Sequence, residues 1–452
     1  MRTYKQIATL ALLAILATGT TAQTETVHLK GQLLQMGTNE VPMRFDGAAA
    51  LVGDSRNILL HTDAEGRFDT IISLSQPTYY SICRNTLYLT PGDDLTLKIT
   101  QSNTEAEFSG KGAEVNNYMK FRLFPKGGSF LEGGSNLRKD FASTKALIDS
   151  LAAVRRTQLD ALKQATPLFK ELEAARITGD VLNSYLSYAS YSGISRQVKT
   201  REEFVQKTDS FYHTITPYVK PLFAQLAKDE FLDVAVVRDV LDNVAFPQTS
   251  TQKEWAKGIE VTPRMKELYA TATEVDKLRE HIDNQVIEKA QAYAAQLKNA
   301  DFAAELNAKI AQAGKLLRGQ PAIDFELTGA DGKQYRLSHF KGKTLYLDFW
   351  ATWCGPCIQE SPYFEALAKE MKDRSITFIP ISTDTNKKAW LNFIKAHKKE
   401  LPQYNTTSEV LSSGWIIYGI PRFVVIDKDF RIVDAFAPRP SEDAAKKLLM
   451  SL

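Results

Sequence analysis

Cysteine is scarce in this chain, with three residues among 452. So few thiols exclude a fold that depends on several structural disulfides. The six histidines show no spacing typical of metal ligands. We therefore expect neither a metal site nor a bound cofactor.

The chain also lacks a strong charge of one sign and any apolar run long enough to span a bilayer. Its net charge is +3 and the charges are interspersed, so we expect no nucleic-acid partner. The apolar run from Ile7 to Ala17 is shorter than the ~20 residues that a membrane helix needs. It follows Arg2 and Lys5 and precedes small residues, which predicts a signal peptide over residues 1–22 and export to the periplasm. Retention of this segment as an anchor is the alternative, and it would make the protein membrane-associated.

Two of the three cysteines stand close together, at Cys354 and Cys357. The apolar run over 344–350 predicts a buried strand, and the spacing of apolar residues after Cys357 predicts a helix. Cys354 should therefore lie at the first turn of a helix, where unpaired N–H groups and the helix dipole favour a thiolate. Such a cysteine is a nucleophile at neutral pH.

Further residues around this motif fit a known pattern. Asp348 stands six positions before Cys354, Pro362 follows Cys357 by five, and Gly419-Ile420-Pro421 precedes an apolar strand. With these residues the segment from about 320 to 452 resembles the thioredoxin superfamily, in particular the TlpA/ResA-like exported thiol–disulfide oxidoreductases. Many proteins of that branch carry asparagine where this chain has Asp348, which here matches the reducing thioredoxins.

The resemblance implies roles for the motif residues. Cys354 would be the exposed attacking thiol and Cys357 would resolve the mixed disulfide. Asp348 would lie beneath the pair, where burial raises its pKa and lets it accept the proton of Cys357. A structural, salt-bridged carboxylate is the alternative for Asp348.

Other residues are expected to shape the site or to contact the substrate. Pro421, if cis, would bring the backbone of Ile420 against the cysteines, where an extended substrate could pair. Glu360 would tune the thiols, contact the substrate or lie on a solvated helix face. The full set of site-shaping residues is Trp353, Gly355, Pro356, Glu360, Ile420 and Pro421.

The length predicts more than one domain, and the pattern of apolar residues changes along the chain. Period-two alternation over 23–110 predicts an all-β, sandwich-like domain that resembles the β-rich domain often preceding thioredoxin-like domains in Bacteroidetes proteins. Helical spacing over 111–315 predicts a helical domain, which begins with a flexible glycine-rich connector at 126–135. The residues 316–452 would form the α/β catalytic domain.

Within the helical domain, two features invite interpretation. Pro217, Pro221 and Pro247 are expected to mark helix ends. Tyr185, Tyr188 and Tyr191 recur at helical spacing, which is typical of core residues more often than of a binding surface.

The third cysteine, Cys83, is expected to be a buried inert thiol, with a regulatory thiol as the alternative.

The leading hypothesis is an exported enzyme that reduces protein disulfides through Cys354 and Cys357. Its partners would be protein disulfide substrates and an external thiol electron donor, a membrane thiol–disulfide carrier. Two alternatives stay open. One is a disulfide oxidase or isomerase, and the other is a partner-binding protein that uses the thioredoxin-like domain as a scaffold.

Overall fold

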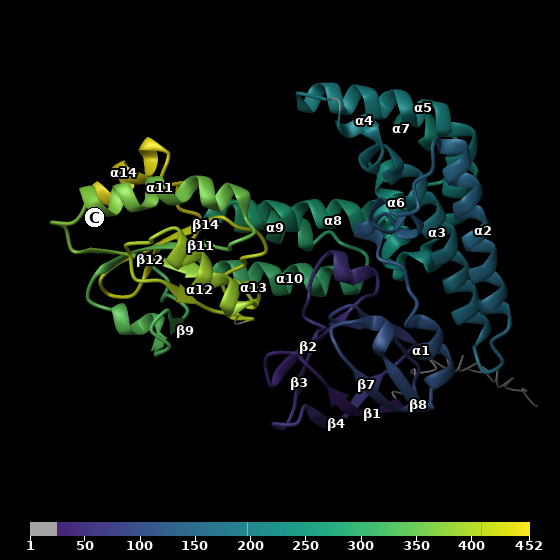
Figure 1. Cartoon of the computed structure of the whole chain (residues 1–452), viewed down its shortest axis with the longest axis horizontal. Helices are drawn as coiled ribbons and strands as arrows, with labels where there is room; N and C mark the ends of the chain where they lie inside the picture. Colours follow the sequence, from purple (N-terminus) through teal and green to yellow (C-terminus); the bar gives the residue numbers. More distant parts are fainter. Residues whose placement is uncertain (1–24, 197, 408) are drawn as a thin grey trace, which may run out of the picture.

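A computed structural model describes residues 25–196, 198–407 and 409–452 (Figure 1). The expected signal peptide at 1–22 lies outside these residues. The described chain has β strands at its start, helices in the middle and a mixed sheet with helices at its end. This order of regions is consistent with the multidomain prediction.

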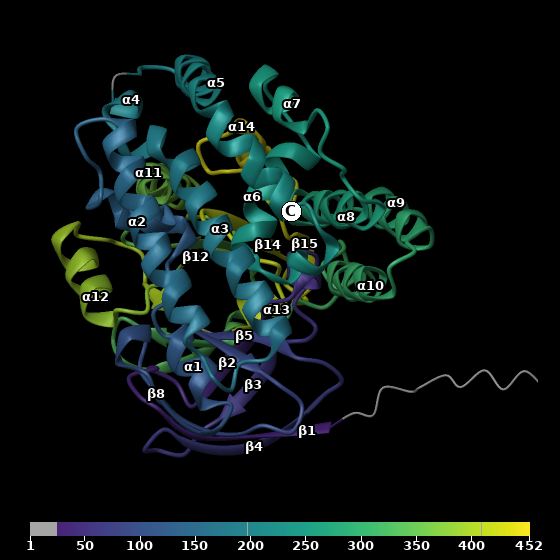
Figure 2. The same cartoon turned by 90° about the vertical axis from the view of Figure 1, so that its right-hand side faces the viewer.

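Two four-stranded sheets make up the N-terminal region, at the bottom of Figure 2. One has the order β4-β1-β7-β8 and the other β3-β2-β5-β6. Both contribute side chains to one apolar cluster, in which Val27, Leu29 and Leu97 are buried. The strands are β1 (Glu25–Leu33), β2 (Glu40–Phe45), β3 (Ile58–His61), β4 (Arg67–Leu74), β5 (Thr78–Ile82), β6 (Asn85–Leu89), β7 (Asp94–Ile99) and β8 (Glu107–Lys111).

The middle region is helical, and its core continues into the C-terminal sheet. Buried side chains of α8 and α10 belong to the same cluster as Leu345, Leu347 and Phe349 of the central strand. The helices are α1 (Ala113–Met119), α2 (Phe141–Asp160), α3 (Pro167–Tyr191), α4 (Gly193–Arg196), α5 (Arg201–Leu226), α6 (Ala235–Ala245), α7 (Ser250–Ala256), α8 (Pro263–Glu280), α9 (Asn284–Ala294) and α10 (Ala300–Gly314). Tyr185 and Tyr188 are buried, which confirms their core placement.

The expectation that Pro217 and Pro221 end helices is wrong, since both lie inside α5. Each interior proline costs a helix ~3 kcal/mol because it removes a hydrogen bond and crowds the preceding turn. The same helix buries Ile215, Val219, Phe223 and Leu226 almost completely. Burial of such side chains contributes ~1.5–3 kcal/mol each, enough to keep the helix continuous.

The glycine-rich stretch 126–135 is not a flexible connector. Phe130 and Leu131 are buried, and the backbone N–H of Phe130 donates to Ser184 Oγ at 3.0 Å. Gly128 has φ 74°, a conformation that glycine adopts without strain. The glycines therefore make tight turns that pack this stretch against α3.

The C-terminal sheet has seven strands in the order β10-β9-β13-β12-β11-β14-β15. Its central strand β11 (Thr344–Trp350) pairs with β12 in parallel and with β14 in antiparallel orientation. Helices α11 and α14 pack on the side of the sheet that carries Tyr346, and α13 packs on the other side, where its Leu411 shares a cluster with Leu347. The chain that follows α12 lies on the α11 side, where Lys399 is 3.0 Å from Glu365. The remaining elements are β9 (Glu326–Gly329), β10 (Gln334–Arg336), α11 (Gly355–Glu370), β12 (Ile376–Ser382), α12 (Lys387–Ala396), β13 (Tyr404–Asn405), α13 (Val410–Ser413), β14 (Arg422–Ile426), β15 (Ile432–Asp434) and α14 (Asp443–Met450).

Candidate active site at the Cys354–Cys357 disulfide

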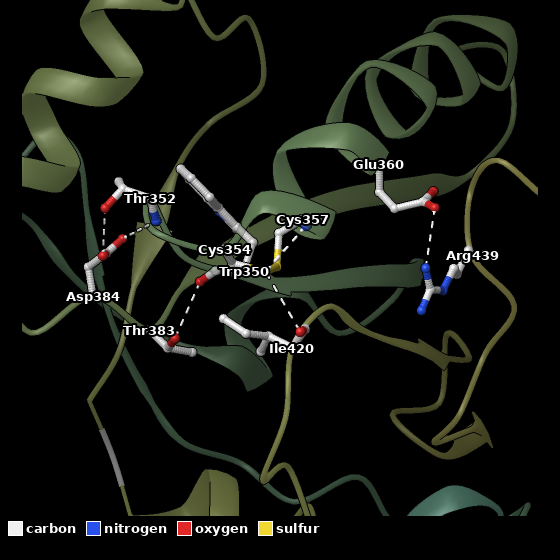
Figure 3. Close-up of a disulfide and its surroundings, with 9 residues drawn as sticks. All are labelled: Trp350, Thr352, Cys354, Cys357, Glu360, Thr383, Asp384, Ile420 and Arg439. Carbon is white, nitrogen blue, oxygen red and sulfur yellow. Dashed lines mark hydrogen bonds and ion pairs between the residues drawn. A yellow bond between two sulfur atoms is a disulfide. The ribbon is translucent and has the colours of Figure 1, made fainter. Parts of the chain in front are cut away.

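The two neighbouring cysteines form a disulfide where β11 leads into α11 (Figure 3). Their Cα atoms are 5.3 Å apart. Cys354 is the N-cap of α11, and its Sγ accepts a hydrogen bond from the backbone N–H of Cys357 at 3.2 Å. Pro356 occupies the first turn, where a missing N–H costs nothing. In the dithiol form, this N–H and the helix dipole would stabilise a thiolate on Cys354.

Both sulfur-bearing residues are covered in this oxidised form. Cys354 is 5% exposed and Cys357 1%, so the expectation of an exposed Cys354 is wrong here. The pair packs in a small apolar cluster with Trp350 and Trp390, and Ile420 lies against it. Cys354 Sγ is 3.7 Å from the carbonyl oxygen of Ile420. Access to Cys354 therefore runs past the segment that carries Ile420.

Asp348 lies on the face of β11 that is turned towards α11, because side chains alternate along a strand. It is buried, and its Oδ1 has no hydrogen-bond partner in the described chain. The pKa of Asp348 is raised from 3.8 to about 8, chiefly by desolvation; Lys399 lowers this pKa and Glu360 raises it, and about 8 is the net result. This carboxyl can therefore bind and release a proton near neutral pH.

Glu360 is held inside the domain, so the reading of a solvated helix face is wrong. It is 8% exposed, and its carboxylate accepts hydrogen bonds from the backbone N–H and the hydroxyl of Ser441 at 3.2 and 2.9 Å. Arg439 Nη1 lies 3.8 Å from Oε1 (Figure 3). The carboxylate of Glu360 also raises the pKa of Asp348.

A groove runs beside the disulfide, with a volume of about 580 Å³. Its lining includes Arg44, Trp353, Thr383, Thr385, Glu409 and Ile420. Trp353 is 72% exposed, so its ring offers a broad apolar contact surface. The Ile420–Pro421 peptide is cis, as the sequence suggested. Gly355 faces open space, and no close packing requires glycine there.

Sequence reasoning missed Asp384, which fixes the loop just before Cys354. Asp384 is 3% exposed and accepts hydrogen bonds from the backbone N–H of Thr352 at 3.0 Å and from its hydroxyl at 2.8 Å (Figure 3). Ser382 Oγ donates to the same carboxylate at 2.8 Å. The signal available in the sequence was an aspartate two residues after the apolar run that forms β12, at the edge of the sheet where β11 also ends.

Residues far upstream in the sequence also reach the site. Tyr418 stands two positions before Ile420, and its hydroxyl donates to Asp54 Oδ2 at 2.9 Å. Lys309 Nζ donates to the same hydroxyl at 2.6 Å and to Asp54 Oδ1 at 2.5 Å. Arg44 Nη2 is 3.1 Å from Glu409. The N-terminal and helical regions therefore hold the segment that precedes the cis-proline.

Cys83 is exposed, which corrects the expectation of a buried thiol. It follows strand β5 with φ 51°, and its Sγ lies 3.7 Å from Met36 Sδ. Desolvation raises the pKa of Cys83, which disfavours the thiolate. Cys83 lies in the turn that follows β5, and it does not line the groove beside the disulfide.

Within residues 25–196, 198–407 and 409–452, no group of three or more His, Cys, Asp or Glu side chains could hold a metal ion. None of the helices in the same ranges is long and apolar enough to cross a membrane.

Known proteins resemble this chain around the disulfide. The sequence model of the Redoxin family matches residues 317–449. Thiol-disulfide oxidoreductase ResA of Bacillus thuringiensis (strain Al Hakam) is 30% identical over 120 residues, which cover 26% of this chain and 69% of that protein. ResA of Bacillus subtilis (strain 168) is 29% identical over 127 residues, covering 28% of this chain and 71% of that protein.

Solved structures give similar matches. A candidate thiol-disulfide oxidoreductase from Bacteroides vulgatus is 55% identical, covers 30% of this chain and 97% of its own, and has a TM-score of 0.30. The pneumococcal exposed lipoprotein thioredoxin of Streptococcus pneumoniae strain TIGR4 is 34% identical, covers 29% of this chain and 100% of its own, and has a TM-score of 0.26.

Proposed function

Because this chain belongs to the ResA-like thiol-disulfide oxidoreductases of the thioredoxin superfamily, we propose that it is an exported enzyme that reduces protein disulfides. Two observations support this proposal, namely the Cys354–Cys357 disulfide at the start of α11 and the buried Asp348 carboxyl on the face of β11 turned towards α11, whose pKa desolvation raises to about 8. A proton carrier works best when its pKa is near the ambient pH.

The proposed reaction starts from the dithiol form. The Cys354 thiolate attacks one sulfur of the client disulfide, and the other client sulfur leaves as a thiolate that takes a proton from water. Cys357 then gives its proton to the ionised carboxylate of Asp348 and attacks Cys354 Sγ, which releases the second client sulfur. Two electrons have passed to the client, and the enzyme is left in the disulfide form seen here.

A dithiol donor must return two electrons to Cys354 and Cys357 after each cycle. We assign this role to a membrane thiol–disulfide carrier, since an exported enzyme meets an oxidising environment. The signal-peptide pattern of residues 1–22 supports export. We also propose functional units at 23–110, 111–315 and 316–452, boundaries that fall close to the start of α1 and the end of α10.

The reduction potential of the Cys354–Cys357 pair tests the direction of electron flow. Equilibration of the purified chain with thiol–disulfide buffers should give a potential of about −270 mV, as for a reducing thioredoxin. A value of about −120 mV would assign the chain to disulfide formation instead. Cys83→Ser should leave the potential unchanged, because Cys83 takes no part in the disulfide.

A further inference from the structure

The stretch 386–399 carries unusual charge for this chain. It contains five lysines, one histidine and no acidic residue, whereas the whole chain has 56 basic and 53 acidic residues. The stretch forms α12 and the turn that follows it. An excess of positive charge is therefore concentrated on one short helix and the turn that follows it.

The buried side of α12 belongs to the redox site. Trp390 is 1% exposed and packs in the same cluster as Trp350, Cys354 and Cys357. Phe393 and Ile394, three and four positions later, pack against this cluster. Since residues at this spacing share one helix face, the lysines are left on the outer faces.

Four of the lysines are exposed, namely Lys387, Lys388, Lys395 and Lys398. Among the residues that the structure describes, none of these four has a carboxylate oxygen within 4 Å of its Nζ. Lys399 differs, because it is partly buried and lies 3.0 Å from Glu365. The outer surface of α12 therefore keeps its positive charge uncompensated.

This basic surface borders the groove beside the disulfide. Thr383 and Thr385 line the groove with Trp353 and Ile420. Asn386 follows directly and caps α12, since its side chain accepts a hydrogen bond from Ala389 N–H at 3.0 Å. Lys387 and Lys388 therefore follow Thr385 of the groove lining by two and three residues, which is at most roughly 10 Å along the chain. A polypeptide whose disulfide reaches Cys354 would pass close to them.

We propose that the exposed surface of α12 and of the turn after it, defined by Lys387, Lys388, Lys395 and Lys398, is a docking surface for clients with acidic residues near their disulfide. The proposal rests on the proposed reductase function and names the class of client. A positive surface beside the reacting sulfur attracts negatively charged partners over a Debye length of ~8–10 Å and can raise association rates by 10–1,000-fold. A polypeptide fits better than an anionic membrane because the surface adjoins the groove, and a flat membrane surface would present no disulfide to Cys354.

The test compares two synthetic peptides that share one intramolecular disulfide and differ only in flanking glutamates or lysines. With the full chain at low salt, kcat/KM for the acidic peptide should exceed that for the basic peptide by ~10-fold, mainly through KM. The preference should fade at high salt because screening removes it. The double variant Lys387→Glu/Lys388→Glu should abolish the preference, and Lys387→Arg/Lys388→Arg should retain it.

The matched control is Lys341→Glu/Lys343→Glu, which changes two exposed lysines just before β11, at the strand end opposite the disulfide. This control should keep the wild-type preference. Equal kcat/KM for the two peptides with the wild-type chain would overturn the proposal, as would equal loss of preference in the control. A different outcome would assign the surface to a membrane. In that outcome the wild-type chain shows no peptide preference but binds anionic phospholipid vesicles, and Lys387→Glu/Lys388→Glu loses this binding. If the wild-type chain also fails to reduce a neutral small disulfide, the reductase function itself is refuted.

Discussion

Replacing Asp348 by asparagine removes an ionisable group and keeps the size of the side chain. The pKa of this carboxyl rises from the ordinary 3.8 to about 8, chiefly because burial disfavours the charged form. The folded protein therefore holds the proton up to about pH 8, whereas the unfolded chain releases it near pH 4. The stability linked to this proton is fully present below pH 4 and is lost as the pH rises to 8.

The size of the effect follows from the same values. One pKa unit is worth ~1.4 kcal/mol, so ionisation of Asp348 lowers the free energy of unfolding by ~0.5 kcal/mol at pH 4, ~4 kcal/mol at pH 7 and ~6 kcal/mol above pH 9. Asparagine is uncharged throughout. The unfolding free energy of Asp348→Asn, minus that of the wild type, should therefore grow by about 5 kcal/mol between pH 4 and pH 9.

The measurement is denaturant unfolding of both oxidised proteins at pH 4, 7 and 9. Asp331→Asn is a control, because a hydrogen bond from the backbone of Lys333 lowers the pKa of that exposed carboxyl. For this control, the stability difference should not grow with pH. A stability difference between Asp348→Asn and the wild type that stays constant from pH 4 to pH 9 would refute the argument.

The same substitution also tests the proposed chemistry. Loss of a general base should slow resolution of the mixed disulfide by ~100- to 10,000-fold. In the wild type, the rate should rise with pH through about 8 as Asp348 ionises. A stopped-flow profile of Asp348→Asn that keeps this rise would show that another group carries the proton.

Two further predictions concern residues that act through others. Glu360 raises the pKa of Asp348, so Glu360→Gln should move the midpoint of the pH–rate profile below about 8. Cys354 of the reduced variant should still be alkylated, which shows that the thiol remains accessible. An unmoved midpoint would contradict the electrostatic coupling between Glu360 and Asp348. Asp384→Asn replaces a carboxylate that accepts three hydrogen bonds, two of them from Thr352. The substitution should lower the free energy of unfolding by ~1–3 kcal/mol and shift the reduction potential of the cysteine pair. An unchanged potential in a destabilised variant would limit Asp384 to a structural role.

The parts of the site that were predictable from the sequence depend on local structure. The strand–cysteine–helix unit spans 344–370, and its apolar spacing, its N-cap and the burial of Asp348 follow from neighbouring residues. The cis peptide before Pro421 could be expected only through the family resemblance. Solvent exposure was predicted less well. The exposure of Cys83, Cys354 and Glu360 depends on whether distant elements pack over these residues.

Errors in the helical region have a similar physical origin. Pro217 and Pro221 signal helix ends when only local propensity is considered, yet the apolar side of α5 outweighs their cost. The glycines of 126–135 suggest flexibility, and in the structure they permit the turns that bury Phe130 and Leu131. In both cases tertiary packing decides the conformation.

Residue spacing could not predict contacts between segments that lie far apart in the sequence, and one of these contacts bears directly on the redox site. Lys309 and Asp54 are 255 positions apart, and Asp54 and Tyr418 are 364 apart. Burial lowers the pKa of Lys309, and Asp54 opposes this effect by binding the ammonium group. A cation so deeply buried is tolerated only when partners satisfy it, so Asp54 and Tyr418 must stay in place when Lys309 is charged. Because Tyr418 is two residues from Ile420, whose carbonyl faces Cys354, this network makes the geometry at the disulfide depend on the N-terminal and helical regions.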